Sequence, residues 1–252
     1  MKAGPSRLAT IVAAALSLAG CSVWHFDFGR AHVVADAGAA DVAAAERALR
    51  NRRWPEAVAR AEQAVTRDGS DGARRALLGT AYLRAGRFRS AAQAFDDALA
   101  LRQADGATAL HLVLAQIASG QHDAAQATLS RYAALIPAAD RGLALALAGA
   151  PGQGVEVLMA AMRVPGADAR TRQNLALALA LAGEWPDAFF LVGLDLPPAK
   201  ARERILGWMR FARPHGAADQ VAALLKITPA IDPGQPEALA LHRADPVTVA
   251  AD

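Results

Sequence analysis

The sequence of 252 residues has one cysteine, Cys21, and few aromatic residues, which make up 5% of the chain. A single thiol excludes an intramolecular disulfide and any metal site built from several cysteines. The chain is 54% hydrophobic, and alanine and leucine supply most of that fraction. This composition disfavours a sheet core and favours closely packed helices, in a chain long enough for one domain with a substantial core.

Sequence patterns for catalysis and metal binding are also missing. The six histidines are scattered, at positions 25, 32, 111, 122, 215 and 242, and form no HxxxH or HExxH pair. Gly149, Gly152 and Gly154 precede no Lys-Ser/Thr pair, so we interpret them as a helix–helix turn rather than a phosphate loop. Asp96 and Asp97 would point about 100° apart on a helix and are interpreted as a solvated face. The sequence therefore predicts no enzyme, no cofactor and no metal site.

Charge of one sign is not in large excess either. The chain has 27 basic and 24 acidic residues, and two of the basic ones, Lys2 and Arg7, lie within the first 20 residues, which hold no acid. No dense basic run with interleaved aromatic residues occurs. These observations predict that the protein does not bind nucleic acid.

The N-terminus has the layout of an export signal. Lys2 and Arg7 precede an apolar run over 8–20, which is shorter than the roughly 20 residues that a transmembrane helix needs. The run ends in LAGC (18–21), which resembles the bacterial lipobox. This resemblance implies cleavage before Cys21 and attachment of lipid to its thiol; the alternative is an ordinary cleaved signal with an incidental cysteine.

Lipidation would make residues 1–20 a signal peptide and place Cys21 on a membrane surface. Several acyl chains anchor a protein stably where a single chain is marginal. Ser22 stands where an Asp would retain a lipoprotein in the inner membrane of enteric-type bacteria. We therefore expect a lipid anchor on the periplasmic face of the outer membrane. Residues 21–37 show no sustained helical period and are predicted to be a tether.

A regular repeat of small and apolar residues organises the centre of the chain. The segment LLGTAYLRAGRFRSAAQAFDDALA (77–100) resembles the tetratricopeptide pattern, with Gly79 and Tyr82 on a first helix and Gly86 at the turn. Its second helix carries small and apolar residues, and steps of 34 preserve them: Ala57, Ala61 and Ala64; Ala91, Phe95 and Ala98; Ala125, Leu129 and Tyr132. Small residues at these positions let two helices cross at close range.

The turn position keeps the same period, as Arg52, Gly86 and Gly120. Agreement of the turn, the crossing and the packing positions predicts an all-α fold, a tetratricopeptide-repeat α-α superhelix of about five to six helix pairs over 38–228. The alternative is an irregular helical bundle.

The later units are less regular. Helical runs over 141–148 and 154–163 follow, and the next clear turn glycine is Gly183, which falls short of two full periods after Gly120. One pair is therefore predicted to be shortened. A further pair begins with a helix over 174–182.

The C-terminal part is predicted to end the stack. A pair over 199–212 and 216–226 would close its exposed end, as terminal repeats must. From residue 229 the chain carries four prolines and no period, so 229–252 is predicted to be a disordered tail.

First helices line the inner face of a tetratricopeptide superhelix. The candidate groove residues are Glu46, Arg50, Thr80, Arg84, Leu110, Leu114 and Ile117. The Lys and Asn residues with which chaperone-binding relatives clamp a carboxylate are absent from the matching positions. An apolar groove with Arg50 and Arg84 near one edge would suit an amphipathic helix or a hydrophobic strand. The alternative is that several of these side chains pack against the next repeat.

Two short stretches point to a narrower family. RQNLALALALAG (172–183) and DLPP (195–198) resemble the TadD-type lipoprotein of tight-adherence (Flp) pilus systems, over about residues 40–226. ILGWMR (205–210) departs from the Asn-Ala-Tyr-rich helix expected there. The resemblance implies a pilotin-like assembly factor that binds the secretin or other pilus components. The alternative is a periplasmic scaffold for enzymes of peptidoglycan or outer-membrane biogenesis.

Overall fold

A computed structural model describes residues 38–101, 105–213 and 216–241. Across these residues the chain forms twelve α-helices and one short 3-10 helix, and it forms no strand. The prediction of an all-α fold is confirmed. The predicted signal peptide, Cys21 and the tether lie outside the described residues.

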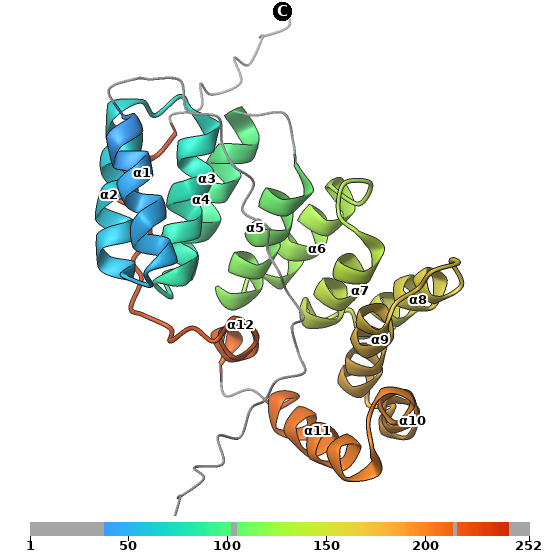
Figure 1. The fold of residues 1–252 in the computed structure, drawn as a ribbon. Coiled ribbons are helices and arrows are strands. Elements are labelled where there is room, and N and C mark those ends of the chain that lie inside the picture. Colours follow the sequence, from blue (N-terminus) through green and yellow to red (C-terminus); the bar gives the residue numbers. More distant parts are fainter. Residues whose placement is uncertain (1–37, 102–104, 214–215, 242–252) are drawn as a thin grey trace, which may run out of the picture.

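The helices follow one another as α1 (Ala39–Arg50), α2 (Trp54–Arg67), α3 (Gly72–Arg84), α4 (Phe88–Leu101), α5 (Gly106–Ala118), α6 (His122–Arg131), α7 (Ala138–Leu147), α8 (Pro151–Met162), α9 (Ala169–Ala182), α10 (Trp185–Asp195), α11 (Pro198–Phe211) and α12 (Ala217–Leu225), before the 3-10 helix η1 (Glu237–Leu239). From α1 to α11 each helix packs against the next. They form an arc that begins at α1 and α2 and ends at α10 and α11 (Figure 1).

Local sequence signals start these helices. Asp71, Asp105 and Asp168 precede the first helices α3, α5 and α9, and each side chain accepts a hydrogen bond from a backbone N–H of the first turn. Pro55 and Pro186 lie in the first turn of the second helices α2 and α10, where the missing N–H has no intrahelical partner to lose.

The turns within the helix pairs share one backbone geometry. Arg52, Gly86, Gly120, Gly149 and Gly183 have φ angles of 56°, 76°, 75°, 83° and 89°. The sequence pattern alone does not mark Gly149 as a turn of this kind. Gly149 precedes Gly183 by one full period but follows Gly120 by less than one, so the shortening lies before Gly149. The shortened unit is therefore the one that leads into the α7–α8 pair.

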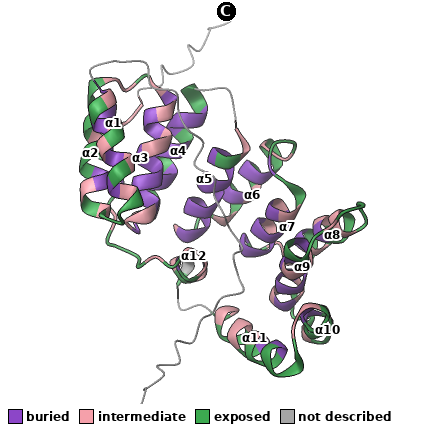
Figure 2. Ribbon diagram, in the orientation of Figure 1, coloured by how far each residue is buried: buried purple, intermediate pink, exposed green. Residues whose placement is uncertain are grey.

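When the repeats are aligned on their turn residues, with Gly149 included, two buried positions recur in each of five helix pairs. The crossing residues are Ala57, Ala91, Ala125, Gly154 and Ala188, and the packing residues four positions later are Ala61, Phe95, Leu129, Leu158 and Val192. All ten are buried, which shows that five helix pairs use the same contact. Figure 2 shows the burial concentrated in α3, α4 and α5, with more exposed residues on α8, α10 and α11.

Arg52 provides a test of the turn geometry. A left-handed conformation costs a residue with a Cβ roughly 1–2 kcal/mol, and glycine avoids this cost. Arg52→Gly is expected to raise the free energy of unfolding by about 1 kcal/mol, measured by urea denaturation. Asn51→Gly is the control, because Asn51 has an ordinary φ of −89° and glycine there loses only chain entropy. Equal effects of the two substitutions would contradict the assignment of strain to Arg52.

The last two helices do not form the expected terminal pair. α11 packs against α10 and α9, whereas α12 turns back and packs against α5 (Figure 1). Ala218, Val221, Ala222 and Leu225 form a single stripe along α12, and Val221 and Ala222 are buried in the main core. This stripe is covered by the middle of the stack instead of by α11.

The segment that follows α12 also differs from its sequence-based expectation of disorder. Apart from η1, residues 228–241 run as an extended chain alongside α4 and end near the N-terminus of α3, held by side-chain and backbone hydrogen bonds. The rest of the predicted disordered tail, 242–252, lies outside the described residues. We call 228–241 the docked tail. An extended chain that is held by contacts to other helices has no hydrophobic period of its own, so its sequence resembles a disordered one.

Candidate protein-binding surface

The predicted groove residues divide into a buried group and a surface group. Leu110, Leu114 and Ile117 on α5 are at most 4% exposed and belong to the main hydrophobic core. Thr80 on α3 is also buried, and its hydroxyl donates to the carbonyl of Ala76 at 2.9 Å. The apolar part of the predicted groove is therefore covered in this chain.

The charged groove candidates lie nearer to solvent. Glu46 and Arg50 form an ion pair of 3.7 Å between successive turns of α1, and Arg50 is exposed. Arg84 at the end of α3 is half-buried. Burial, followed by the positive charge of Arg52, lowers the pKa of Arg84 below its ordinary value. The guanidinium groups of Arg52 and Arg84 thus give this edge of the stack a positive charge.

Helix α12 covers the inner face. Every residue of α5 from Thr108 to Ala118 is buried, although a first helix that lines an open groove leaves one face uncovered. α12 packs on α5, and its Val221 and Ala222 join the same buried cluster as Leu114 and Ile117. A C-terminal helix of the chain itself occupies the place predicted for a ligand.

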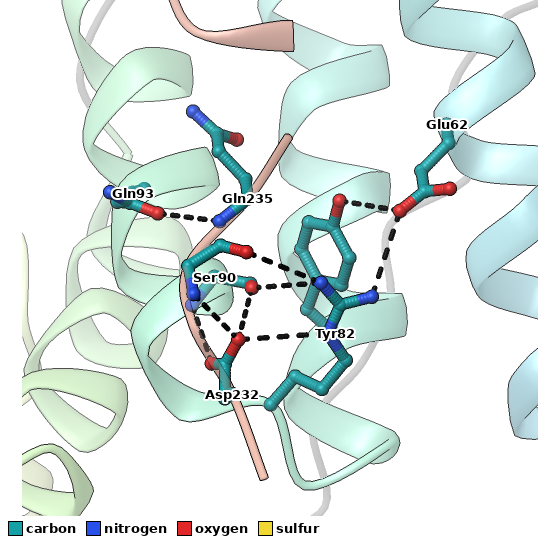
Figure 3. A network of polar contacts seen from close by, with 8 residues as sticks. Glu62, Tyr82, Ser90, Gln93, Asp232 and Gln235 are labelled. Carbon is teal, nitrogen blue, oxygen red and sulfur yellow. Dashed lines mark hydrogen bonds and ion pairs between the residues drawn. The ribbon is translucent and has the colours of Figure 1, made fainter. Parts of the chain in front are cut away.

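Asp232 attaches the docked tail to the N-terminus of α4 (Figure 3). Its carboxylate accepts the backbone N–H of Ser90 at 2.7 Å and the Ser90 hydroxyl at 2.5 Å, and it lies 3.6 Å from the Arg87 guanidinium. Burial alone would raise the pKa of Asp232, but these hydrogen bonds and the Arg87 charge outweigh it and lower the pKa. Asp232 therefore stays charged at neutral pH and supplies a cap to a helix that is distant in sequence.

Tyr82 connects this attachment to α2. Its hydroxyl donates to Glu62 at 2.7 Å, and Arg87 lies 4.4 Å above its ring (Figure 3). Burial and the hydrogen bond to Glu62 raise the pKa of Tyr82, so it remains a neutral donor. The side chains of three helices thus meet at the start of the docked tail.

A second attachment holds the far end of the docked tail. Arg75 forms a buried ion pair with Asp97 at 3.0 Å and donates to the carbonyl of Leu239 at 2.7 Å. Asp97 also accepts from the side chain of Gln235 at 3.0 Å and from the backbone N–H of Leu241 at 3.3 Å. The interpretation of Asp97 as part of a solvated face is wrong, because the docked tail and Arg75 enclose it.

The turn at Gly86 touches the tail backbone directly. The carbonyl of Gly86 accepts from the N–H of Ala230 at 3.1 Å, and a Cβ added at residue 86 would lie 2.1 Å from the carbonyl oxygen of Thr228. Glycine is therefore required at this turn for its positive φ and for the close approach of the tail.

Comparison with known proteins identifies the repeat. Residues 82–148 match the family described as tetratricopeptide repeat. This part of the chain is a tetratricopeptide repeat region. The same all-helical superhelix is seen in solved structures that are similar to the chain, and the predicted fold class is confirmed. Stacks of such repeats present extended surfaces for binding other proteins.

The similar solved structures are of MamA. MamA 41-end from Desulfovibrio magneticus RS-1 is 18% identical, with a TM-score of 0.52 over 71% of this chain and 98% of that one. A crystal structure of MamA protein is 17% identical, with a TM-score of 0.51 over 69% of this chain and 92% of that one. At these identities the likeness shows the fold alone. No curated protein sequence matches the chain.

The described residues show no alternative kind of site. None of the helices in 38–101, 105–213 and 216–241 is long and apolar enough to cross a membrane. Within the same residues no group of three or more His, Cys, Asp or Glu side chains is placed to hold a metal ion. Gly149 forms a turn between α7 and α8, as expected, but Gly152 and Gly154 lie within α8, so the predicted helix–helix turn is shorter than the sequence indicates.

His111 lies inside the tetratricopeptide core. Its ring stacks on Phe95 with ring centroids 5.4 Å apart and an interplanar angle of 27°. Burial, followed by the positive charge of Arg84, lowers the pKa of His111 to about 4. The imidazole is therefore neutral at physiological pH and acts as a packing group.

The lowered pKa of His111 predicts acid sensitivity. The unfolded chain takes up the proton near pH 6.5 and the folded chain only near pH 4, so stability is complete above pH 6.5 and falls as the pH drops between these values. Between pH 7.5 and pH 5 the loss is expected to be about 2 kcal/mol from this group. His111→Phe should remove that part of the pH dependence in urea denaturation. Parallel curves for wild type and variant would contradict the burial of a neutral histidine.

Proposed function

We propose that the chain is a lipid-anchored, non-enzymatic assembly factor of a tight-adherence (Flp) pilus system, with a pilotin-like role. The tetratricopeptide scaffold supplies protein binding. The lipobox ending at Cys21 would supply a location on the periplasmic face of the outer membrane. The RQN and DLPP stretches supply the resemblance to the TadD-type lipoprotein. The secretin or another pilus component is the proposed partner.

One observation supports this resemblance beyond a generic repeat: RQN (172–174) and DLPP (195–198) form a single joint. Arg172 Nε donates to both carboxylate oxygens of Asp195, at 3.1 and 3.0 Å, and Gln173 donates to the same carboxylate at 2.5 Å. The hydrogen bonds from Arg172, together with the charge of its guanidinium, lower the pKa of Asp195. Two motifs that lie on different helices thus depend on each other.

The same joint fixes the neighbouring helices. The buried Asn174 donates to the carbonyl of Ala139 at 3.1 Å, and Arg204 on α11 donates to Gln173 at 3.0 Å. Each residue of the RQN stretch therefore contacts a different part of the stack. Arg172 holds the end of α10, Gln173 contacts both the end of α10 and α11, and Asn174 holds the start of α7. These contacts give the RQN and DLPP stretches one structural role in this chain, and that role supports the proposed kinship with the TadD-type lipoproteins.

The experiment is Cys21→Ala in the native host. If lipid anchoring serves pilus assembly, secretin multimers and surface pili should both fall severely, because the protein leaves the membrane where the secretin assembles. Immunoblotting of unheated membranes and electron microscopy of pili are the measurements. Ser22→Ala is the control, since the cysteine and the lipid remain.

Normal secretin multimers and normal pili in the Cys21→Ala strain would overturn this function. Affinity capture of the mature protein then separates the alternatives. Recovery of secretin or pilus proteins supports the proposal, whereas recovery of peptidoglycan hydrolases or barrel-assembly proteins supports the scaffold role.

A further inference from the structure

Helix α12 has the character of a bound peptide. It has nine residues, Ala217–Leu225, and isolated helices shorter than about 12–15 residues are marginal in water. Its helical state therefore depends on the contact with α5. The contact uses small and medium apolar side chains at Ala218, Val221, Ala222 and Leu225, with the spacing of an amphipathic helix laid on a groove.

The surface beneath α12 is the one on which tetratricopeptide stacks bind partners. Leu110, Leu114 and Ile117 occupy the inner-face positions of α5, and Val221 of α12 is fully buried in the same cluster. The closing role expected for a terminal helix would have placed α12 on α11. Instead Leu206 and Met209 of α11 remain exposed. α12 thus covers the middle of the inner face and leaves the end of the stack open.

We propose that the inner face around α5 is a binding site for an amphipathic helix of a partner protein whose apolar stripe consists of small and medium side chains like that of α12, and that α12 occupies this site until the partner displaces it. The docked tail sets how firmly α12 is held, through Asp232 at Ser90 and through the backbone contact at Gly86. The proposal rests on the protein-binding role of the repeats. It needs neither lipid nor pili.

The test uses the full chain and a fluorescent synthetic peptide with the sequence of residues 216–241. In the wild type α12 fills the site. The apparent affinity for the peptide is therefore lowered in proportion to the small fraction of molecules in which the site is open. Val221→Asp weakens the packing of α12, and Asp232→Ala removes the tail attachment. The peptide is expected to bind the double variant at least tenfold more tightly than wild type, measured by fluorescence anisotropy. Leu206→Asp, on the exposed side of α11, should leave the affinity at the wild-type value.

Equal peptide affinity for wild type and for a double variant that retains its helical circular dichroism would overturn the proposal. If the double variant loses its fold, Asp232→Ala alone replaces it, because that change leaves the apolar contacts of the repeats in place. Hydrogen exchange on this variant should then show faster exchange at 217–225 when the peptide is in excess, and unchanged exchange would also overturn the proposal. The anisotropy and hydrogen-exchange measurements both use purified protein. Their outcome therefore does not depend on the outcome of the Cys21→Ala experiment, and the two proposals can fail separately.

Discussion

Arg75→Met is expected to lower the free energy of unfolding by about 3–5 kcal/mol, because it leaves the buried carboxylate of Asp97 without its ion-pair partner. Arg75 is 4% exposed, and besides the 3.0 Å contact to Asp97 it donates to the carbonyls of Gly69 at 2.6 Å and Leu239 at 2.7 Å. Methionine fills similar space but offers no donor to any of the three. Urea denaturation followed by circular dichroism measures the loss.

The matched control for Arg75→Met is the double variant Arg75→Met/Asp97→Leu. Replacing both charges by apolar groups of similar size removes the unpaired carboxylate, so much of the stability should return. The double variant should also detach the end of the docked tail, because Gln235 and Leu241 lose their acceptor. A loss below about 1 kcal/mol in Arg75→Met would show that water reaches Asp97 and that the ion pair is a surface one.

Gly154→Ala is expected to lower the free energy of unfolding by about 2–3 kcal/mol, although alanine is the better helix former. A Cβ at residue 154 would lie 2.4 Å from the carbonyl oxygen of Gly142, and a Cβ at residue 142 would lie 2.9 Å from the carbonyl oxygen of Gly154. The obstacles are backbone atoms, so α7 and α8 must move apart. Thermal unfolding of the variant measures the effect.

Gly152→Ala is the control for that experiment. Gly152 lies two positions earlier in the same helix, and a Cβ there meets no atom within 4 Å. The substitution should raise stability by up to about 1 kcal/mol through helix propensity alone. If both glycine substitutions raise stability, the close crossing of α7 and α8 is contradicted.

The repeats could be predicted because each depends on residues close in sequence. Small residues at Ala91 and Ala125 and turn glycines at Gly86 and Gly120 recur at a fixed spacing, and the helix pairs follow from them. Gly149 is hard to recognise because Pro151, Gly152 and Gly154 follow it closely and also favour turns, although all three lie within α8. The fold class therefore follows from the sequence more fully than the register of the fourth pair.

The covering of the inner face could not be predicted in the same way. The stripe of Ala218, Val221 and Ala222 shows that α12 is amphipathic but does not show which surface it packs on. The docked tail depends on single polar contacts, such as Asp232 to Ser90 and Arg75 to Leu239, whose partners are 142 and 164 residues apart. No periodic signal marks such pairs, so a proline-rich docked chain and a disordered one look alike in sequence.

The long sequence separations between the docked tail and its partners determine the order in which the parts of the protein fold. Neighbouring helix pairs can form as soon as they emerge during synthesis or export, since their contacts are local. Asp232 and Leu239 emerge after all the helices from α1 to α12, and their partners on α3 and α4 are then already in place. The surface of α5 thus passes through a period in which no later residue is available to cover it. A newly made chain therefore exposes this face before α12 and the docked tail can close it.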